Sequence, residues 1–558
     1  MKTRDKKPAA AADVKQAFTL MSRDSISRRE FLVASAAFGV TITLPGEFAA
    51  ALDGKKSFTI LHTNDMHTSF IGMGPAADYT PFSLNDDATR GGYARLASLI
   101  AMKKELRKGQ GPVLVLDAGD YSMGTAFAAA TREIGGELKL MGMMGYAATT
   151  FGNHEFDLGP DGLGKSIGVA AKAGRVPAVL ASNASFAAND ATLGDLQRLT
   201  KAGVIRRYLV IERGGIRFGI FGLLGKEALH YTSGGAVAFA DPIETAKEMV
   251  TLLRDKEKVD LVICLSHGGL EKGKDGRYTD GEDVGLAKAV PGIDVVISGH
   301  SHTFLDEATI VNDRTPVVQA GKESKCLGEL TITIDNNKLT VESYKLHPID
   351  DSIAGDRTIA AEIDKLKKGV TAAVFASRGY SIDQPLAMAP QDIPNTFTDI
   401  AASTLLANLL TDAFRNATQA DIGFTANGTM RAGLARGKTG VQTVYDVFAM
   451  APLGGGIVDN TAGSALVTGY LNGLDLKNLL EYMLVDNPTH PGEFFPRASG
   501  MRFRYNLSRP QYDAVTAIEL GDIDRGYKAI DISGKSDRLY SLTCPLMVGQ
   551  FIVAIPKF

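Results

Sequence analysis

The sequence has few cysteines, no tryptophan and no excess of basic residues. Three cysteines, Cys264, Cys326 and Cys544, are too few for a disulfide framework or a cysteine-rich zinc site. Without tryptophan, aromatic recognition must come from phenylalanine and tyrosine. The 60 Lys and Arg stand against 63 Asp and Glu, a formal charge of −3, and this balance argues against a nucleic-acid polymer as partner.

Long hydrophobic runs are missing as well. The apolar run from Phe31 to Leu44 has 14 residues, whereas a membrane span needs roughly 20, so we expect no stable membrane anchor. The chain does have globular composition, with 45% hydrophobic and 22% charged residues. Its 558 residues exceed one ordinary core, which predicts two or more domains.

The N-terminal segment has the features of an export signal. Residues 1–29 hold eight Lys and Arg, the apolar run comes next, and the small residues Ala49, Ala50 and Ala51 follow it. The segment Ser27-Arg28-Arg29-Glu30-Phe31-Leu32 resembles a twin-arginine motif. This order predicts a signal peptide over residues 1–51, passage through the twin-arginine translocase, and a periplasmic or otherwise exported protein. A disordered basic tail with a chance arginine pair is the alternative.

From Phe58 to about Pro348, apolar runs alternate with longer amphipathic stretches. The runs are continuous and rich in Val, Ile and Leu, as in strands buried on both faces. Two pairs of runs flank Gly214-Gly215 and Asn336-Asn337 and predict hairpins. The predicted strands are Phe58–Leu61, Val113–Leu116, Val176–Leu180, Tyr208–Ile211, Arg217–Phe221, Val259–Leu265, Ile293–Ile297, Pro316–Val318, Leu330–Ile334 and Leu339–Tyr344.

Two further regions follow. Residues 356–373 are polar with apolar residues at helical spacing, which predicts an exposed connecting helix. From about Ala376 a second region begins, with a helix near Ala401–Phe414 and short strand-like runs to the end. The fold class is therefore mixed α/β, with more than one domain.

Chemically active residues gather just after the predicted strands. Five of the nine histidines lie in these places. In open α/β sheets, residues past the carboxyl ends of strands converge on one crevice, so we expect these side chains to meet. The motifs are Asp65-x-His67, Gly119-Asp120, Gly152-Asn153-His154-Glu155 with Asp157, Ser266-His267-Gly268 and Gly299-His300-Ser301-His302.

Oxygen and imidazole ligands without thiolates suit divalent Zn, Mn, Fe or Co. Two Asp, one Asn and four His make seven such ligands. Seven ligands are too many for one tetrahedral ion and enough for two, if one carboxylate bridges the ions. Two ions roughly 3.5–4 Å apart clamp the attacking and leaving oxygens of an in-line displacement. Phosphate esters are the substrates that most need such charge neutralisation. Any one of these residues has an ordinary explanation as a turn former, but chance placement of the whole set is a poorer account.

These motifs together resemble the calcineurin-like metallophosphoesterase signature. The variant is similar to the bacterial exported family of 5′-nucleotidases, UDP-sugar hydrolases and cyclic-nucleotide phosphodiesterases. The resemblance implies a four-layer α-β-β-α metallophosphatase domain over residues 52–350. It also implies a linking helix over 351–375 and a smaller α/β substrate domain of the 5′-nucleotidase type over 376–558.

The resemblance also assigns roles to the residues, with two divalent ions such as Mn, Zn or Co as cofactors. Asp65, His67, Asp120 and His302 would hold one ion, with Asp120 bridging. Asn153, His267 and His300 would complete the second site. His154 would stabilise the transition state or protonate the leaving oxygen, and Asp157 would orient His154. His302 stands where some members have Gln.

The C-terminal half departs from the family pattern. The usual Asn-x-Gly-x-Ile-Arg is Ala426-Asn427-Gly428-Thr429-Met430-Arg431 here, so Arg431 and Asn427 are the candidate substrate residues. A base-stacking Phe is replaced by Leu453, and the family's second stacking ring is absent. Phe494, Phe495 and Arg497 could rebuild a pocket, or the two Phe could be core. Each aromatic stack on a base is worth about 1–3 kcal/mol, so these losses weaken base recognition.

The leading hypothesis is an exported two-metal phosphoesterase that hydrolyses nucleotides by attack of activated water on phosphorus. A thiosulfohydrolase of sulfur oxidation resembles the same architecture, and its carrier-bound substrate needs no base-stacking pair. A phosphatase of a non-nucleotide ester is a further alternative. A binding protein with a dead site would predict gaps among the ligands, and the sequence has none.

Overall fold

The computed structural model describes residues 55–232, 235–335, 338–396, 403–455, 463, 465–485 and 492–554. The described residues from Lys56 onward form one unit. The predicted signal peptide, residues 1–51, lies outside the described residues, as does the Asn336-Asn337 turn.

A first sheet brings together both ends of the N-terminal half. Its strands are β1 (Lys56–Thr63), β2 (Val113–Asp117), β3 (Ala148–Thr150), β4 (Ala178–Leu180), β6 (Ile205–Arg206), β14 (Cys326–Asp335) and β15 (Lys338–Pro348). Their order is β15-β14-β1-β2-β3-β4-β6. The five strands from β1 to β6 pair in parallel, while β14 is antiparallel to β1 and β15 to β14. Strand β3 was not predicted because Ala-Thr-Thr forms no apolar run.

A second sheet contains β7 (Tyr208–Arg213), β8 (Ile216–Leu224), β10 (Leu261–His267), β11 (Val295–Ser298), β12 (Thr309–Val311) and β13 (Thr315–Val318). Their order is β12-β13-β11-β10-β8-β7. The four central strands are parallel, and the antiparallel strands β7 and β12 form the edges. The predicted hairpin around Gly214-Gly215 is β7–β8. A short pair, β5 (Ala184–Ser185) and β9 (Ala238–Phe239), lies apart from both sheets.

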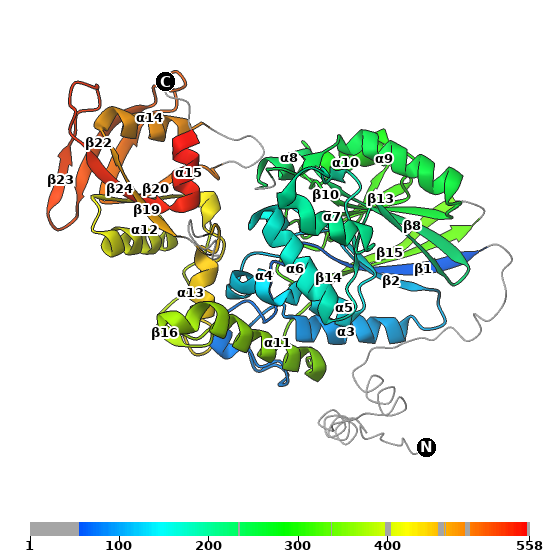
Figure 1. The fold of residues 1–558 in the computed structure, drawn as a ribbon. Coiled ribbons are helices and arrows are strands. Elements are labelled where there is room, and N and C mark those ends of the chain that lie inside the picture. Colours follow the sequence, from blue (N-terminus) through cyan, green and yellow to red (C-terminus); the bar gives the residue numbers. More distant parts are fainter. Residues whose placement is uncertain are drawn as a thin grey trace, which may run out of the picture. The chain divides into compact units, whose positions relative to one another are not determined.

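The two sheets pack face to face between helices (Figure 1). Ile60 and Leu114 of the first sheet share one core with Ile220 and Ile263 of the second. The outer face of the first sheet is covered by α3 (Tyr93–Leu106), α5 (Gly136–Met144), α6 (Gly159–Ala173) and α7 (Gly194–Lys201). The outer face of the second sheet is covered by α9 (Pro242–Thr251) and α10 (Glu282–Ala289). The predicted four-layer α-β-β-α class is confirmed. Two short helices, α4 (Thr131–Ile134) and α8 (Lys226–His230), complete this half.

The predicted exposed helix is half buried. Helix α11 spans Arg357–Val370 and begins at Asp356, whose carboxylate accepts hydrogen bonds from Thr358 N and Ile359 N. Ile363 and Leu366 enter the same core as α3 and α5. The prediction of exposure was wrong because the polar residues cover only the outer side of an amphipathic helix.

The C-terminal region has smaller sheets. A four-stranded sheet has the order β19 (Leu466–Leu471), β24 (Tyr540–Pro545), β17 (Ile422–Ala426), β20 (Pro496–Ser499). A three-stranded sheet contains β21 (Met501–Tyr505), β22 (Val515–Asp522) and β23 (Gly526–Ala529), and β16 (Pro385–Met388) pairs with β18 (Val441–Thr443). The helices are α12 (Leu405–Thr418), α13 (Val444–Met450), α14 (Gly473–Met483) and α15 (Leu546–Ala554). The helix predicted near 401–414 is α12.

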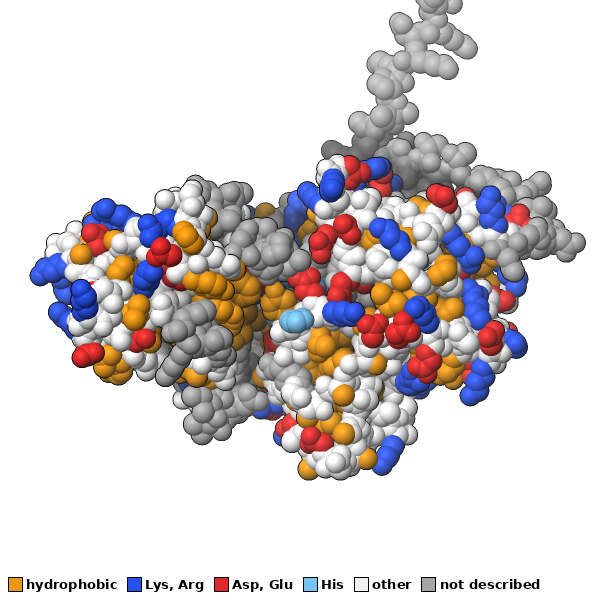
Figure 2. Space-filling model, turned by 90° about the horizontal axis from the view of Figure 1, so that it is seen from above, with side chains coloured by type: hydrophobic (Ala, Val, Ile, Leu, Met, Phe, Trp, Pro, Cys, Tyr) orange, Lys and Arg blue, Asp and Glu red, His pale blue; other side chains and the backbone are white. Residues whose placement is uncertain are grey.

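Figure 2 shows basic and acidic side chains interspersed over one face of the molecule. Within the described part of the chain, no helix combines the length and apolar character needed to cross a membrane.

Candidate active site

The parallel strands deliver the predicted residues to one place. Asp65 follows β1, Asp120 follows β2 and Asn153 follows β3 in the first sheet, while His267 ends β10 and His300 follows β11 in the second. The sequence analysis expected these residues to meet in one crevice at the carboxyl ends of the strands. In the structure that place lies where the carboxyl ends of two stacked sheets meet.

The backbone at this place is unusual. Asp65, His67, Asp120, His300 and His302 all have positive φ, between 47° and 75°. For residues with a Cβ this left-handed conformation costs about 1–2 kcal/mol each. Five such residues in one cluster show that the surrounding fold holds these loops in a conformation they would not choose alone.

The glycines of the motifs let the loops approach the candidate ligands. A Cβ at Gly152 would lie 2.1 Å from Asp120 Oδ1, and one at Gly299 would lie 2.6 Å from His267 Nδ1. Both distances are far inside van der Waals contact. Neither position therefore accepts a larger residue without moving a candidate metal ligand.

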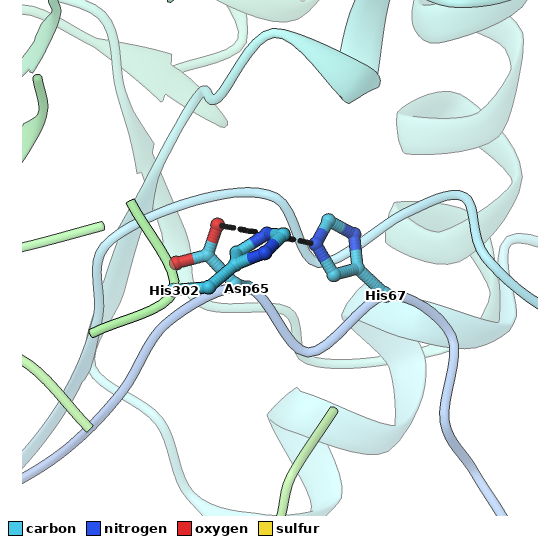
Figure 3. Close-up of side chains that lie close together, drawn as sticks. All are labelled: Asp65, His67 and His302. Atoms are coloured by element: carbon cyan, nitrogen blue, oxygen red, sulfur yellow. Dashed lines mark hydrogen bonds and ion pairs between the residues drawn. The ribbon is translucent and has the colours of Figure 1, made fainter. Parts of the chain in front are cut away.

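Asp65, His67 and His302 form a first cluster that could hold a cation (Figure 3). His67 Nε2 lies 3.0 Å from His302 Nε2, and Asp65 Oδ1 lies 3.5 Å from His302 Nε2 and 3.9 Å from His67 Nε2. His67 Nδ1 lies 3.2 Å from Ser122 O, so its proton faces that carbonyl and Nε2 faces the cluster.

Burial keeps both imidazoles of this cluster neutral. It lowers the pKa of His67 to about 3, and it lowers the pKa of His302 well below the usual value with help from the positive charge of Lys322. The Nε2 atoms of these two neutral imidazoles lie 3.0 Å apart beside the carboxylate of Asp65. A divalent cation fits this donor set, because neutral imidazole nitrogens and a carboxylate oxygen are ligands that such ions take.

Asp65, Asp120 and His267 form a second cluster. His267 Nδ1 lies 2.8 Å from Ala118 O, and its Nε2 lies 3.2 Å from Asp120 Oδ2. Burial acts to lower the pKa of His267, but the charges of Asp120 and Asp65 outweigh it and raise the pKa to about 10. A metal ion between these groups would take the place of that proton.

Asp65 belongs to both clusters. Its Oδ1 lies 3.9 Å from His267 Nε2 as well as near the first pair of imidazoles. The resemblance instead assigned the shared position to Asp120, whose Oδ1 here accepts a hydrogen bond from His154 N at 2.9 Å. The side-chain geometry thus makes Asp65 the carboxylate common to both groups.

Asn153 and His300 lie on the side of the second cluster. His300 Nδ1 is 3.1 Å from Asn153 Oδ1, and the His300 ring centroid is 5.3 Å from that of His267. The His300 backbone N–H also points at both oxygens of Asp65, at 3.1 Å each.

His154 and Asp157 form a pair at the edge of the first cluster. His154 Nδ1 lies 2.9 Å from Asp157 Oδ2, and the His154 ring meets His67 edge to face with 5.5 Å between centroids. Burial acts to lower the pKa of His154, but the charges of Asp157 and Asp120 prevail and raise it. Asp157 contacts Nδ1 of His154, so the other ring nitrogen of His154, Nε2, is not bonded to Asp157.

Sequence reasoning missed the residues that hold these loops. Glu155 accepts hydrogen bonds from Asp120 N, Ser122 N and Gly152 N, at 3.0, 3.0 and 2.6 Å. Asn64 donates to Asp65 Oδ2 at 2.6 Å. Both stand next to predicted ligands in the sequence, but only the fold shows that their side chains turn back onto the loops.

The two predicted substrate residues have different surroundings. Arg431 lies close enough to the first cluster for its charge to act on His67 and His302. Asn427 is fully buried and its amide is already engaged, since Oδ1 accepts from Arg497 Nε at 2.6 Å and Nδ2 donates to Gly492 O at 2.9 Å. The side chain of Asn427 therefore holds Arg497 and Gly492 in place, and Arg431 is the better placed of the two for a ligand.

Comparison with known proteins agrees with this geometry. Residues 58–304 match the calcineurin-like phosphoesterase family, and residues 387–534 match the C-terminal domain of 5′-nucleotidases. The chain is 28% identical over 494 residues to the trifunctional nucleotide phosphoesterase protein YfkN of Bacillus subtilis, a match of 84% of this chain and 30% of YfkN. The chain thus spans less than a third of that relative. It is 27% identical over 506 residues to the 5′-nucleotidase of Homo sapiens, covering 84% of this chain and 78% of that one.

Solved structures show the same architecture. The 5′-nucleotidase precursor of Thermus thermophilus superimposes with a TM-score of 0.68 at 25% identity, over 90% of this chain and 92% of that one. A sulfate thiohydrolase, SoxB of the same organism, superimposes with a TM-score of 0.61 at 16% identity, over 88% of each chain. At that identity the second likeness shows the fold alone.

Proposed function

The chain belongs to the calcineurin-like phosphoesterases that carry a 5′-nucleotidase C-terminal domain. We therefore propose that it hydrolyses nucleotides with the help of two divalent metal ions. Members of this group are metal-dependent hydrolases of phosphate esters, and this chain is one of them. The substrate, the number of ions and the route out of the cell are the parts we propose.

One observation carries the two-ion proposal. Two clusters of candidate ligands share Asp65, and each contributes at least one imidazole. A shared carboxylate is what brings two cations to the short separation that in-line displacement at phosphorus needs. Asn153 and His300 add ligands on the side of the second cluster, so the donor set is large enough for both ions.

The residues around the clusters have distinct proposed tasks. When bound, the ions supply charge neutralisation and a nucleophile at neutral pH. His154 presents Nε2 to the leaving oxygen and gives it a proton, while Asp157 fixes the imidazole through Nδ1 and stabilises its protonated form. Arg431 binds the phosphate oxygens through its guanidinium, which has the planar geometry for two parallel hydrogen bonds.

A nucleotide substrate is supported by the C-terminal match and by aromatic residues near the site. Tyr231 lies 6.1 Å from His300 between ring centroids, and its hydroxyl is 3.4 Å from Glu493 Oε2. The next residue, Phe494, stacks on Phe551 with an interplanar angle of 6° and 5.8 Å between centroids. We propose the half-exposed rings of Tyr231 and Phe494 as the base platform in place of the ring lost at Leu453. Phe495 is buried and serves the core.

We also propose that residues 1–51 direct export to the periplasm through the twin-arginine translocase. The support is the order of the basic segment, the Arg28-Arg29 pair, the apolar run and the small residues at 49–51. Replacing both arginines by lysine should retain the protein in the cytoplasm, as measured by cell fractionation. Equal export of the variant would contradict this route.

The test of function is phosphate release from 5′-AMP, 5′-UMP, UDP-glucose, 2′,3′-cyclic AMP and bis-p-nitrophenyl phosphate, each with Mn, Co or Zn. We expect metal-dependent turnover of nucleotides that is lost in His154→Ala. His230→Ala, which removes an exposed histidine outside the site, is the matched control and should keep full activity. Turnover of the generic ester without any nucleotide would reject a nucleotide substrate. A thiosulfonate-loaded carrier would then be the next substrate to test.

A further inference from the structure

A cavity of about 490 Å³ lies beside the candidate metal clusters and is not part of them. Its walls come from residues 73–90, residues 322–325, Asn395 and residues 431–449. Of the residues assigned above, only Arg431 lines it. Its volume is in the range of sites that bind small molecules.

Four cationic residues line the cavity: Arg90, Lys322, Lys325 and Arg431. Among the described residues, the guanidinium groups of Arg90 and Arg431 have no ion-pair partner and donate no hydrogen bond. Both line the cavity, and the two guanidinium groups supply a pair of planar forks suited to an anion.

The three carboxylates in the same walls are already engaged. Asp78 accepts from Lys438 N at 2.6 Å and from Thr439 Oγ1 at 2.5 Å. Asp446 accepts from Ala76 N at 2.9 Å. Glu323 pairs with Lys325, and its Oε1 lies 3.5 Å from Lys322 Nζ. Because these three carboxylates already bond to other groups of the cavity wall, they do not pair with Arg90 or Arg431. Both arginines are therefore available to attract an anionic ligand.

Two amide oxygens in the cavity wall need a donor. Gln442 is 1% exposed; its Nε2 donates to Ala435 O at 2.8 Å, while its Oε1 has no hydrogen-bond partner among the described residues. Asn395 Nδ2 donates to Met430 O at 2.8 Å, and its Oδ1 is likewise without a partner in that part of the chain. Both oxygens are closed to solvent in this conformation, so a ligand carrying N–H or O–H groups reaches them only when the side chains turn toward the cavity. The hydrogen bonds formed would recover the cost of a buried acceptor without a partner, about 1–3 kcal/mol.

The cavity shares wall residues with a recess beside the first metal cluster. A narrow recess at His67 is lined by Lys322, Glu323 and Arg431, and the same three residues line the cavity. Arg431 therefore lines both spaces. This neighbourhood is what a substrate would need in order to place one phosphate at the clusters and a second polar group in the cavity.

We propose that this cavity binds a second anionic group of the substrate, so that the preferred esters have a leaving group with its own phosphate or carboxylate and with hydroxyl or amino donors. The inference rests on the proposed phosphoesterase function and narrows its substrate class. Arg90 would recognise the second anion, and Gln442 and Asn395 would accept hydrogen bonds from the donors.

The experiment compares 5′-AMP with adenosine 3′,5′-bisphosphate in the metal-loaded full chain and in Arg90→Gln. We expect the bisphosphate to have the higher kcat/KM, and Arg90→Gln to lower it about tenfold through KM, the usual scale for one guanidinium–phosphate contact. The variant should leave kcat and the kcat/KM for 5′-AMP unchanged. Arg525→Gln, at an exposed turn between β22 and β23, is the control and should change neither substrate.

Two outcomes overturn the inference: equal kcat/KM for the two substrates, or an equal loss for both in Arg90→Gln. If no nucleotide is hydrolysed, the proposed function fails, and the cavity is then judged by binding of inorganic pyrophosphate in a calorimeter. Binding about tenfold weaker in Arg90→Gln than in the wild-type chain would support an anion site. Equal affinity, or no binding to either protein, would reject it.

Discussion

Asp117, in strand β2 of the first sheet, and Asp283, on helix α10 beside the second sheet, accept equivalent hydrogen bonds. Each is a buried carboxylate that accepts hydrogen bonds from two strand hydroxyls and from one backbone N–H of a turn that follows a strand. For Asp117 the donors are Thr63 Oγ1 at 2.7 Å, Thr149 Oγ1 at 2.7 Å and Gly119 N at 3.0 Å.

For Asp283, on α10, the donors are Ser266 Oγ at 2.5 Å, Ser298 Oγ at 2.5 Å and Gly269 N at 3.1 Å. Ser266 precedes His267, and Ser298 lies two residues before His300. The carboxylate therefore fixes the ends of β10 and β11, from which two candidate ligands project. Groups that orient ligands in this way commonly contribute about 10–100-fold to metal affinity.

We predict that Asp283→Ala weakens metal binding by roughly ten- to a hundredfold, because the two strand ends lose their common acceptor. The measurement is metal affinity by competition with a fluorescent chelator, with circular dichroism to confirm the fold. Asp524→Ala, an exposed position in the C-terminal region, is the control. Unchanged affinity in folded Asp283→Ala would show that the strand ends hold their positions without it.

We predict that chelation abolishes activity and that the two clusters can be emptied separately. His67→Ala removes a ligand of the first cluster only, and His267→Ala one of the second only. Each variant should bind one ion per chain where the wild-type chain binds two, measured by atomic emission after gel filtration. One ion in the wild-type chain would reject the two-ion proposal.

We predict that His154→Ala lowers kcat by roughly 10²–10⁴, the range for loss of a general acid. The defect should shrink for a nitrophenyl ester, whose leaving oxygen needs no proton. Asp157→Asn should lower kcat less, because the imidazole remains but its orientation is no longer fixed. Bound metal should stay at the wild-type level in both. An equal defect with both leaving groups would count against the acid role of His154.

Most candidate ligands could be predicted from the sequence because they lie just past an apolar run. Val113–Asp117 and Leu261–His267 are recognisable as buried strands, and Asp120 and His267 follow from them. Strand β3 carries no apolar run, yet Asn153 was found because its motif is distinctive.

The rest depends on contacts between distant segments. Nothing near Asp283 in the sequence indicates that it joins Ser266 to Ser298, since that requires α10 to pack on the ends of β10 and β11. The sharing of Asp65 by two clusters needs the second sheet to lie against the first. The burial of Ile363 on α11 is likewise decided by a neighbour, α3, that the helix pattern does not reveal.

Glu137, near the start of α5, gives a prediction about pH. Its side chain is 2% exposed; one oxygen accepts a hydrogen bond from Thr131, and the other has no partner among the described residues. Burial raises the pKa of this carboxyl from 4.5 to about 7, although the bond from Thr131 opposes the shift.

Because the folded chain keeps this proton when the unfolded chain has lost it, the free energy of unfolding falls as pH rises from about 4.5 to about 7. At about 1.36 kcal/mol per pKa unit, the full loss is about 3 kcal/mol, complete above pH 7. Glu137→Gln keeps the shape and cannot ionise. It should match the wild-type thermal midpoint at pH 4 and exceed it at pH 8 by scanning calorimetry. Glu212→Gln, which removes an exposed carboxyl, should show no such pH-dependent gain. If the midpoint of Glu137→Gln at pH 8 lies below that of the wild-type chain, the prediction is wrong. The ionised Glu137 carboxylate would then stabilise the folded chain instead of destabilising it.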